Sequence, residues 1–208
     1  MPLDITMTLL SIILMGGLVL FPDDRIHQVL GMILLALWIC HTVLNHRWFS
    51  SLFRGNYPPY RIMQIVVNTG ISAMALLLMI SGIMLAWFLP FDVGKGLGFA
   101  RITHLLASHW YYLFMGAHLG LHASMIFSKI LKGHKMPLLP RIFISLIALY
   151  GLYAFIVRGL WKYMFLRQQF FFFDFGRGYL FFVLDYISIL VLTALLSHLL
   201  ARFLARKK

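Results

Sequence analysis

The chain has no glutamate, and its six acidic residues are all aspartate. Charged residues make up only 12% of the 208 positions, whereas a soluble domain carries about 25%. Hydrophobic residues reach 62%, which excludes intrinsic disorder because disorder requires low hydrophobicity. The formal charge is +12, but the basic residues are scattered between long apolar runs, which speaks against a nucleic-acid partner. The composition therefore predicts an integral membrane protein.

Cysteine is nearly absent as well. Cys40 is the one thiol, so no internal disulfide can form, and no C-x-x-C-H motif is present to attach a c-type haem covalently. The first apolar run follows no basic leader and ends at Phe21-Pro22 without a small-residue cleavage site. We therefore expect this run to be a retained helix and not a cleaved signal peptide.

Long apolar stretches dominate the sequence. A helix needs about 20 predominantly apolar residues to cross a bilayer. This length predicts an all-α integral membrane bundle of about six transmembrane helices, forming one domain over residues 1–208. The stretches are about Leu3–Phe21, His27–His46, Ile62–Leu89, Ile102–Ser128, Arg141–Arg158 and Tyr179–Phe203.

The connecting segments differ in character. Residues 47–61 and 129–140 are basic and contain prolines. Residues 90–101 hold three glycines and are expected to be non-helical. Residues 159–178 are rich in aromatic side chains, including four consecutive phenylalanines, which is typical of a segment lying in the membrane interface.

The basic residues divide unequally between the two sides of such a bundle. Six crossings put both termini on one side, with eleven basic residues there against seven on the other. The positive-inside rule then places both termini in the cytoplasm. The outer seven are Arg25, Lys95, Arg101, Arg158, Lys162, Arg167 and Arg177; most acids, including Asp23, Asp24, Asp92 and Asp174, fall on that side too.

Histidines at matched intervals are the strongest functional signal. His27 and His41 lie 14 residues apart, as do His104 and His118. In a helix this interval is about 21 Å along the axis and brings both side chains within about 40° of one face. The second and fourth predicted helices run in the same direction, so we expect His27 at the depth of His104 and His41 at the depth of His118. Each pair can clamp one haem iron from both sides.

Other histidines fit this pattern less well. His122 lies one turn beyond His118, where it can hydrogen-bond, line a quinone pocket or replace His118 as ligand. The 13-residue interval from His109 to His122 rotates the side chains about 140° apart. We expect structural or interfacial roles for the others, His46, His134 and His198.

Several residues near these histidines are candidates for supporting roles. Arg25 and Arg101 precede the outer histidines and can either neutralise haem propionates or extend to the interface. Asn45 and Arg47 can serve the inner site similarly. Asp185 lies within the last helix, where it pairs with an arginine, relays protons or sits nearer the outer interface. Small residues can admit a haem face or simply allow close helix packing; they are Gly31, Gly116 and Gly120.

Four segments carry a resemblance to a known family. They are HQVLGMILLALWICHTVLNHRW (27–48), SGIMLAWFLPF (81–91), ARITHLLASHWYYLFMGAHLGLH (100–122) and IALYGLYAFIVRGLWKYMFLRQQFFFFDF (147–175). The chain resembles the small bacterial membrane cytochromes b found beside covalently flavinylated extracytoplasmic proteins, within the cytochrome b and ferric-reductase-like transmembrane superfamily. The resemblance covers nearly the whole chain.

This resemblance implies two non-covalent b-type haems in a four-helix core. It maps the family's histidines onto His27, His41, His104, His118 and His122, and it leaves out His109, which stands where the family has an aromatic residue. It implies an electron-transfer subunit of the bacterial cytoplasmic membrane that passes electrons from quinol to an outer flavoprotein or other acceptor. Both a bound quinone and contact with membrane lipid follow from that role.

Alternative functions keep the same histidines. The first is a self-contained transmembrane ferric or quinone reductase, although no nucleotide-binding glycine motif is present. The second is a proton channel or transporter with a histidine relay, which does not explain the two matched intervals. A structural zinc site is a weaker alternative, because the proposed pairs lie near opposite faces and lack cysteine.

Overall fold

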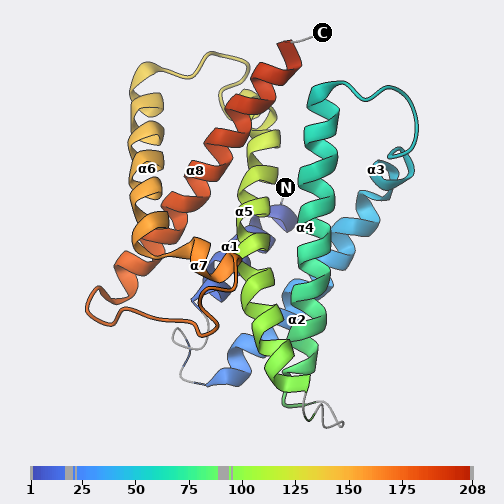
Figure 1. Ribbon diagram of the computed structural model, residues 1–208. Helices are drawn as coiled ribbons and strands as arrows, with labels where there is room; N and C mark the ends of the chain where they lie inside the picture. Colours follow the sequence, from blue (N-terminus) through green and yellow to red (C-terminus); the bar gives the residue numbers. More distant parts are fainter. Residues whose placement is uncertain (1, 17–20, 22, 89–93, 95, 207–208) are drawn as a thin grey trace.

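The computed structural model describes residues 2–16, 21, 23–88, 94 and 96–206, and every regular element within them is a helix (Figure 1). Residues 17–20, near the end of the first predicted apolar run, lie outside the described residues. The same holds for four of the charged residues counted above, Asp92, Lys95, Lys207 and Lys208. The helices are α1 (Pro2–Met15), α2 (Asp24–Leu44), α3 (His46–Ser50), α4 (Pro59–Met84), α5 (Gly96–Ile130), α6 (Leu138–Val157), α7 (Leu160–Met164) and α8 (Gly178–Arg206).

Four of these helices are long and apolar enough to cross a membrane, namely α2, α4, α6 and α8. The chain therefore has the character of an all-α membrane protein. Two further predicted crossings correspond to α1, a shorter apolar helix of 14 residues, and to α5, the longest helix at 35 residues. Helix α5 carries four of the nine histidines and so is more polar than its neighbours.

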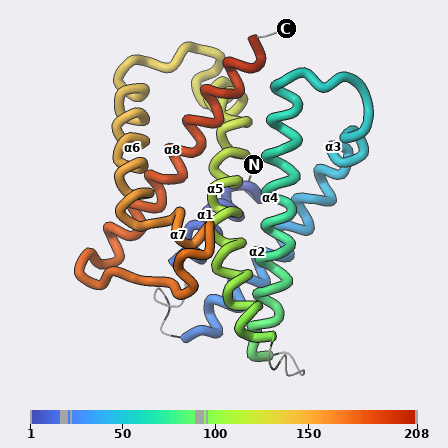
Figure 2. The backbone as a smooth tube through the Cα atoms, viewed as in Figure 1, coloured from blue at the N-terminus to red at the C-terminus, as the bar shows by residue number. Residues whose placement is uncertain are grey.

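The long helices pack in a defined order. Helix α8 lies between α6 and α5, and α5 lies between α8 and α4 (Figure 2). Helices α2 and α5 run in the same direction, because α4 returns the chain between them (Figure 1). The second and fourth predicted helices are therefore parallel. Corresponding ends of α2 and α5 lie side by side.

Small residues bring α8 close to its two neighbours. A Cβ atom added at Gly116 would overlap Thr193, and one added at Gly120 would overlap the backbone carbonyl of Ala194. Gly151 of α6 faces the backbone of α8 in the same way. Gly116 and Gly120 therefore serve close helix packing and do not border open space for a cofactor.

Helix α2 lies against the bundle far more loosely. Leu34 is its one buried residue, with 2% of its surface exposed, and it stands midway between His27 and His41. Helix α1 covers part of the same side, where Ser11 hydrogen-bonds Tyr111 of α5 over 3.1 Å. Helix α2 packs loosely on both sides of Leu34. His27 and His41 therefore lie beside α5 where the side chains of the two helices do not interdigitate tightly.

The prediction that residues 90–101 are non-helical is wrong for its last six positions, since α5 begins at Gly96. A glycine costs a helix only about 1 kcal/mol relative to alanine. Packing of the following turns, which bury Ala100 and Ala107, compensates for that cost. The aromatic segment 159–178 contains the short helix α7 and then a non-helical stretch with exposed phenylalanines.

Candidate functional site

Two pairs of histidines face each other between α2 and α5. The ring centroids of His27 and His104 lie 6.2 Å apart, with an interplanar angle of 67°. Those of His41 and His118 lie 6.3 Å apart, at 78°. These are the two pairs that the matched intervals placed at equal depth. Their nearly equal separations arise because both helices carry the same 14-residue interval in the same direction.

The separation can be compared with that of two imidazoles on one metal ion. With metal–nitrogen bonds of about 2.0–2.1 Å, and about 1.2 Å from ring nitrogen to ring centre, two rings on opposite sides of a metal have centroids about 6.4–6.6 Å apart. Both observed separations are close to this value and shorter than it by about 0.1–0.4 Å. The residues present therefore fit an iron held between two imidazoles, as in a b-type haem site.

The inner pair, His41 and His118, is held by hydrogen bonds at the Nδ1 atom of each ring. His41 Nδ1 lies 2.9 Å from Asp4 Oδ1 of α1, and His118 Nδ1 lies 2.9 Å from Asn68 Oδ1 of α4. A carboxylate or amide oxygen accepts a hydrogen bond from Nδ1–H, which leaves the lone pair on Nε2. Metal-binding histidines characteristically donate their other ring N–H to such an acceptor, which fixes ring orientation. Residue patterns alone had not singled out Asp4 or Asn68 for this role.

In the outer pair, His27 and His104, a hydrogen bond holds the ring of His104 on α5. His104 Nδ1 lies 3.3 Å from Ser81 Oγ of α4, and the Ser81 hydroxyl donates to the Leu77 carbonyl over 2.6 Å. Ser81 must then accept from His104 Nδ1–H, so Nε2 carries the lone pair here too. The absence of a side chain at Gly82 lets the His104 ring lie close to α4. His27 Nδ1 is buried and has no hydrogen-bond partner among the described residues.

Open space adjoins the outer pair at Gly31, one turn after His27. A Cβ atom built at Gly31 meets no atom within 4 Å. This contrasts with Gly116 and Gly120, which are closed in by α8. Of the three glycines that the sequence singled out, only Gly31 borders space that a cofactor can occupy.

The remaining histidines fall into other surroundings. The His122 ring lies 4.8 Å from that of His118, whereas the ring that contacts His41 is that of His118. His109 is buried and stacks on Tyr163 of α7 at 4.4 Å, with its Nδ1 bonded to the Leu105 carbonyl. These contacts favour His118 over His122 as the partner of His41.

The charged and polar residues predicted to support the pairs contact other groups. Arg25 stacks on Trp87 at 4.5 Å, beside a cavity of about 450 Å³ that Asp24 and Gln28 also line. Arg101 is exposed, as is Arg47 of α3. The Asn45 amide donates to the His41 backbone carbonyl over 2.7 Å. Of the two arginines that precede the outer histidines, Arg25 lines this cavity and Arg101 does not.

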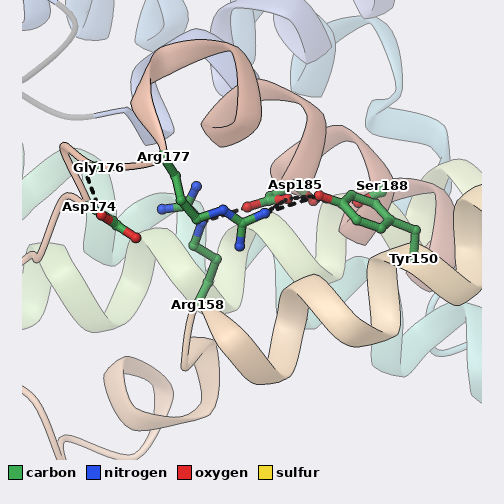
Figure 3. Close-up of polar contacts among 7 residues, drawn as sticks. All are labelled: Tyr150, Arg158, Asp174, Gly176, Arg177, Asp185 and Ser188. Carbon is green, nitrogen blue, oxygen red and sulfur yellow. Dashed lines mark hydrogen bonds and ion pairs between the residues drawn. The ribbon is translucent and has the colours of Figure 1, made fainter.

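A second polar cluster surrounds Asp185, which is fully buried in α8 (Figure 3). Arg158 Nε donates to Asp185 Oδ2 over 2.7 Å, and Tyr150 donates to Oδ1 over 2.6 Å. Arg177 approaches Oδ1 at 3.5 Å. Of the roles left open for Asp185, the structure shows the pairing with arginine. These partners come from other elements, so the sequence alone did not identify them.

Replacement of Asp185 by asparagine should destabilise the protein strongly, because it leaves the Arg158 guanidinium buried without its counter-charge. Removing one partner of a buried ion pair costs about 3–5 kcal/mol. The exposed Asp174, replaced by asparagine, is a matched control that should change stability little. Thermal unfolding of the two variants in detergent measures the difference; equal midpoints would contradict a stabilising role for the Asp185 cluster.

Within the described residues, no group of three or more metal-ligating side chains comes together. Two-histidine sites suit a cofactor that supplies its remaining ligands itself and do not suit a closed tetrahedral zinc site. A comparison of the chain with protein-family models, curated proteins and solved structures finds no match.

Proposed function

We propose that the chain is a membrane b-type cytochrome that holds two non-covalent haems and transfers electrons between quinol and an extracytoplasmic redox partner of flavin type. The observation that carries this proposal is the geometry of the two histidine pairs. They have nearly the same ring separation, and the intervals on α2 and α5 match. In the proposed assignment, His27 and His104 hold the outer haem and His41 and His118 the inner one.

Bound haem would supply reversible one-electron chemistry at each pair. Two imidazoles leave no open position on the iron, so the site suits electron transfer and not oxygen binding. Asp4 and Asn68 orient the inner rings and raise their basicity as ligands. Ser81 does the same for His104, and Arg25 stands where it can neutralise a propionate of the outer haem.

The proposed path runs across the membrane. The two pairs are separated by about 21 Å along the helix axis, which fits one site near each membrane face. We propose that α1 and α5 cross the bilayer together with the four apolar helices, with both termini in the cytoplasm of a bacterial cell. Quinol would then react at one face and the redox partner at the other.

Purified protein should show a split or broad reduced b-type α-band in a reduced-minus-oxidised spectrum. The pyridine haemochrome assay should give about two haems per chain, since each pair supplies both axial ligands. A folded, active preparation without haem would overturn the proposal. Quinol and a ferric chelate, each offered to the isolated chain, distinguish a carrier that needs its partner from a self-contained reductase.

A further inference from the structure

A cavity of about 370 Å³ opens away from the histidine pairs, between the end of α6, α7 and the segment that leads into α8. None of the paired histidines lines it. Its wall combines three cations with one carboxylate, one amide and one exposed aromatic ring. These residues are Arg158, Lys162, Arg177, Asp174, Gln168 and Phe172.

Positive charge is in excess around this cavity. Asp185 lies behind the wall and pairs with Arg158 and Arg177, so the two carboxylates Asp174 and Asp185 offset two of the three cations. One positive charge remains. The Arg158 side chain is only 9% exposed, and its Nη2 has no hydrogen-bond partner among the described residues. Because water screens a buried charge poorly, the Arg158 guanidinium adds to the attraction of the cavity for an anion.

Contacts of the buried Tyr163 side chain fix the shape of the cavity wall. Tyr163 is buried on α7, stacks on His109 of α5, and accepts hydrogen bonds from the Gln168 amide and the Phe172 backbone N–H. Burial raises the pKa of the Tyr163 hydroxyl, so it remains neutral. These contacts anchor the segment that carries Gln168 and Phe172 against the bundle.

Aromatic and apolar side chains surround the charged cavity. Phe170, Phe172 and Phe175 are each more than three-quarters exposed, and Trp161 is 42% exposed. Exposed aromatic rings of this kind lie at the headgroup level of a membrane. Next to these rings, α6 presents an apolar surface that includes the exposed Leu149, Leu152 and Ile156. A ligand with a charged head and apolar chains suits this combination.

We propose that this cavity binds the phosphate group of an anionic phospholipid, whose acyl chains lie along α6. Arginine and lysine side chains pair well with phosphate oxygens, and a phosphodiester carries the single negative charge that the cavity lacks. Three of the seven basic residues that the charge count puts on the outer side gather at this one place. The proposal rests on the membrane setting of the chain and does not depend on haem.

The test uses the full chain in nanodiscs of equimolar phosphatidylcholine and phosphatidylglycerol. After transfer to detergent, native mass spectrometry should show phosphatidylglycerol retained in preference to phosphatidylcholine. K162Q should lower that preference about five-fold, and K162Q combined with R177Q more than about ten-fold, because each basic residue near a membrane surface contributes separately. The single variant leaves the Asp185 cluster intact and so keeps the fold.

A charge-matched control replaces Arg167 and Lys135, both exposed and outside the cavity, by glutamine. It should retain the wild-type preference. An unchanged preference in K162Q and in the double variant, or an equal loss in the control, overturns the proposal. Inorganic phosphate supplies the second arm: if phosphate binds the protein and phosphatidylglycerol shows no preference over phosphatidylcholine, the site takes the free anion and not a lipid. Haem content in the same samples tests the cytochrome proposal separately.

Discussion

Replacement of His41 by alanine should remove one haem and leave the other in place. His118 would remain as a single imidazole at the inner site, while the His27 and His104 pair is one full interval away on both helices. The pyridine haemochrome assay should fall from about two haems per chain to about one, since an axial ligand is lost at one iron only. One component of the reduced α-band should disappear, and the residual component should match the outer haem.

The matched control for this variant is His46 replaced by alanine. His46 lies on the same stretch of chain, but it is exposed and its Nδ1 bonds the Val43 carbonyl. Both haems should survive in the control. If His41→Ala keeps two haems with unchanged spectra, the inner pair is not the ligand set, and His122 becomes the residue to replace next.

Replacement of Gly31 by leucine should abolish the outer haem and leave the polypeptide folded. The first carbon of the new side chain meets no protein atom within 4 Å, so the position is open to a side chain where it leaves the backbone. The same carbon extends from α2 one turn after His27, into the space where the face of an outer haem would approach the backbone. Haem content should fall to about one per chain while the inner component of the spectrum persists.

Ala36→Leu is the control, because Ala36 is exposed and lies about 140° around α2 from Gly31. It adds bulk to the same helix and should keep both haems. Gly116 would be a poor choice, since a side chain there disrupts packing of α5 on α8 regardless of any cofactor. Two haems in a folded Gly31→Leu variant would mean that no cofactor lies against this face of α2.

The role of each glycine illustrates how far sequence patterns reach. Gly31, Gly116 and Gly120 all lie near paired histidines along the chain, and spacing alone does not distinguish open space from close packing. The distinction depends on what stands opposite each glycine. Helix α8 stands opposite Gly116 and Gly120, and the residues of α8 that they meet, Thr193 and Ala194, follow them by 77 and 74 residues.

The sequence by itself determined the all-α membrane character, the approximate limits of the long helices and the pairing of histidines by depth. Apolar length and helical periodicity are local properties, and two equal intervals on parallel helices align without knowledge of any other contact. The start of α5 at Gly96 does not follow from the sequence, because local glycine content gives no sign of the packing that extends the helix.

Only the tertiary structure decided which groups hold the histidine rings and what surrounds Asp185. Asp4, Asn68 and Ser81 reach the rings from α1 and α4, and Asp185 is reached by Tyr150 of α6 and by Arg158, the residue after α6. Each contact joins single residues on different helices. A single residue leaves no periodic signal in the chain, so its partner becomes apparent only when the helices are packed together.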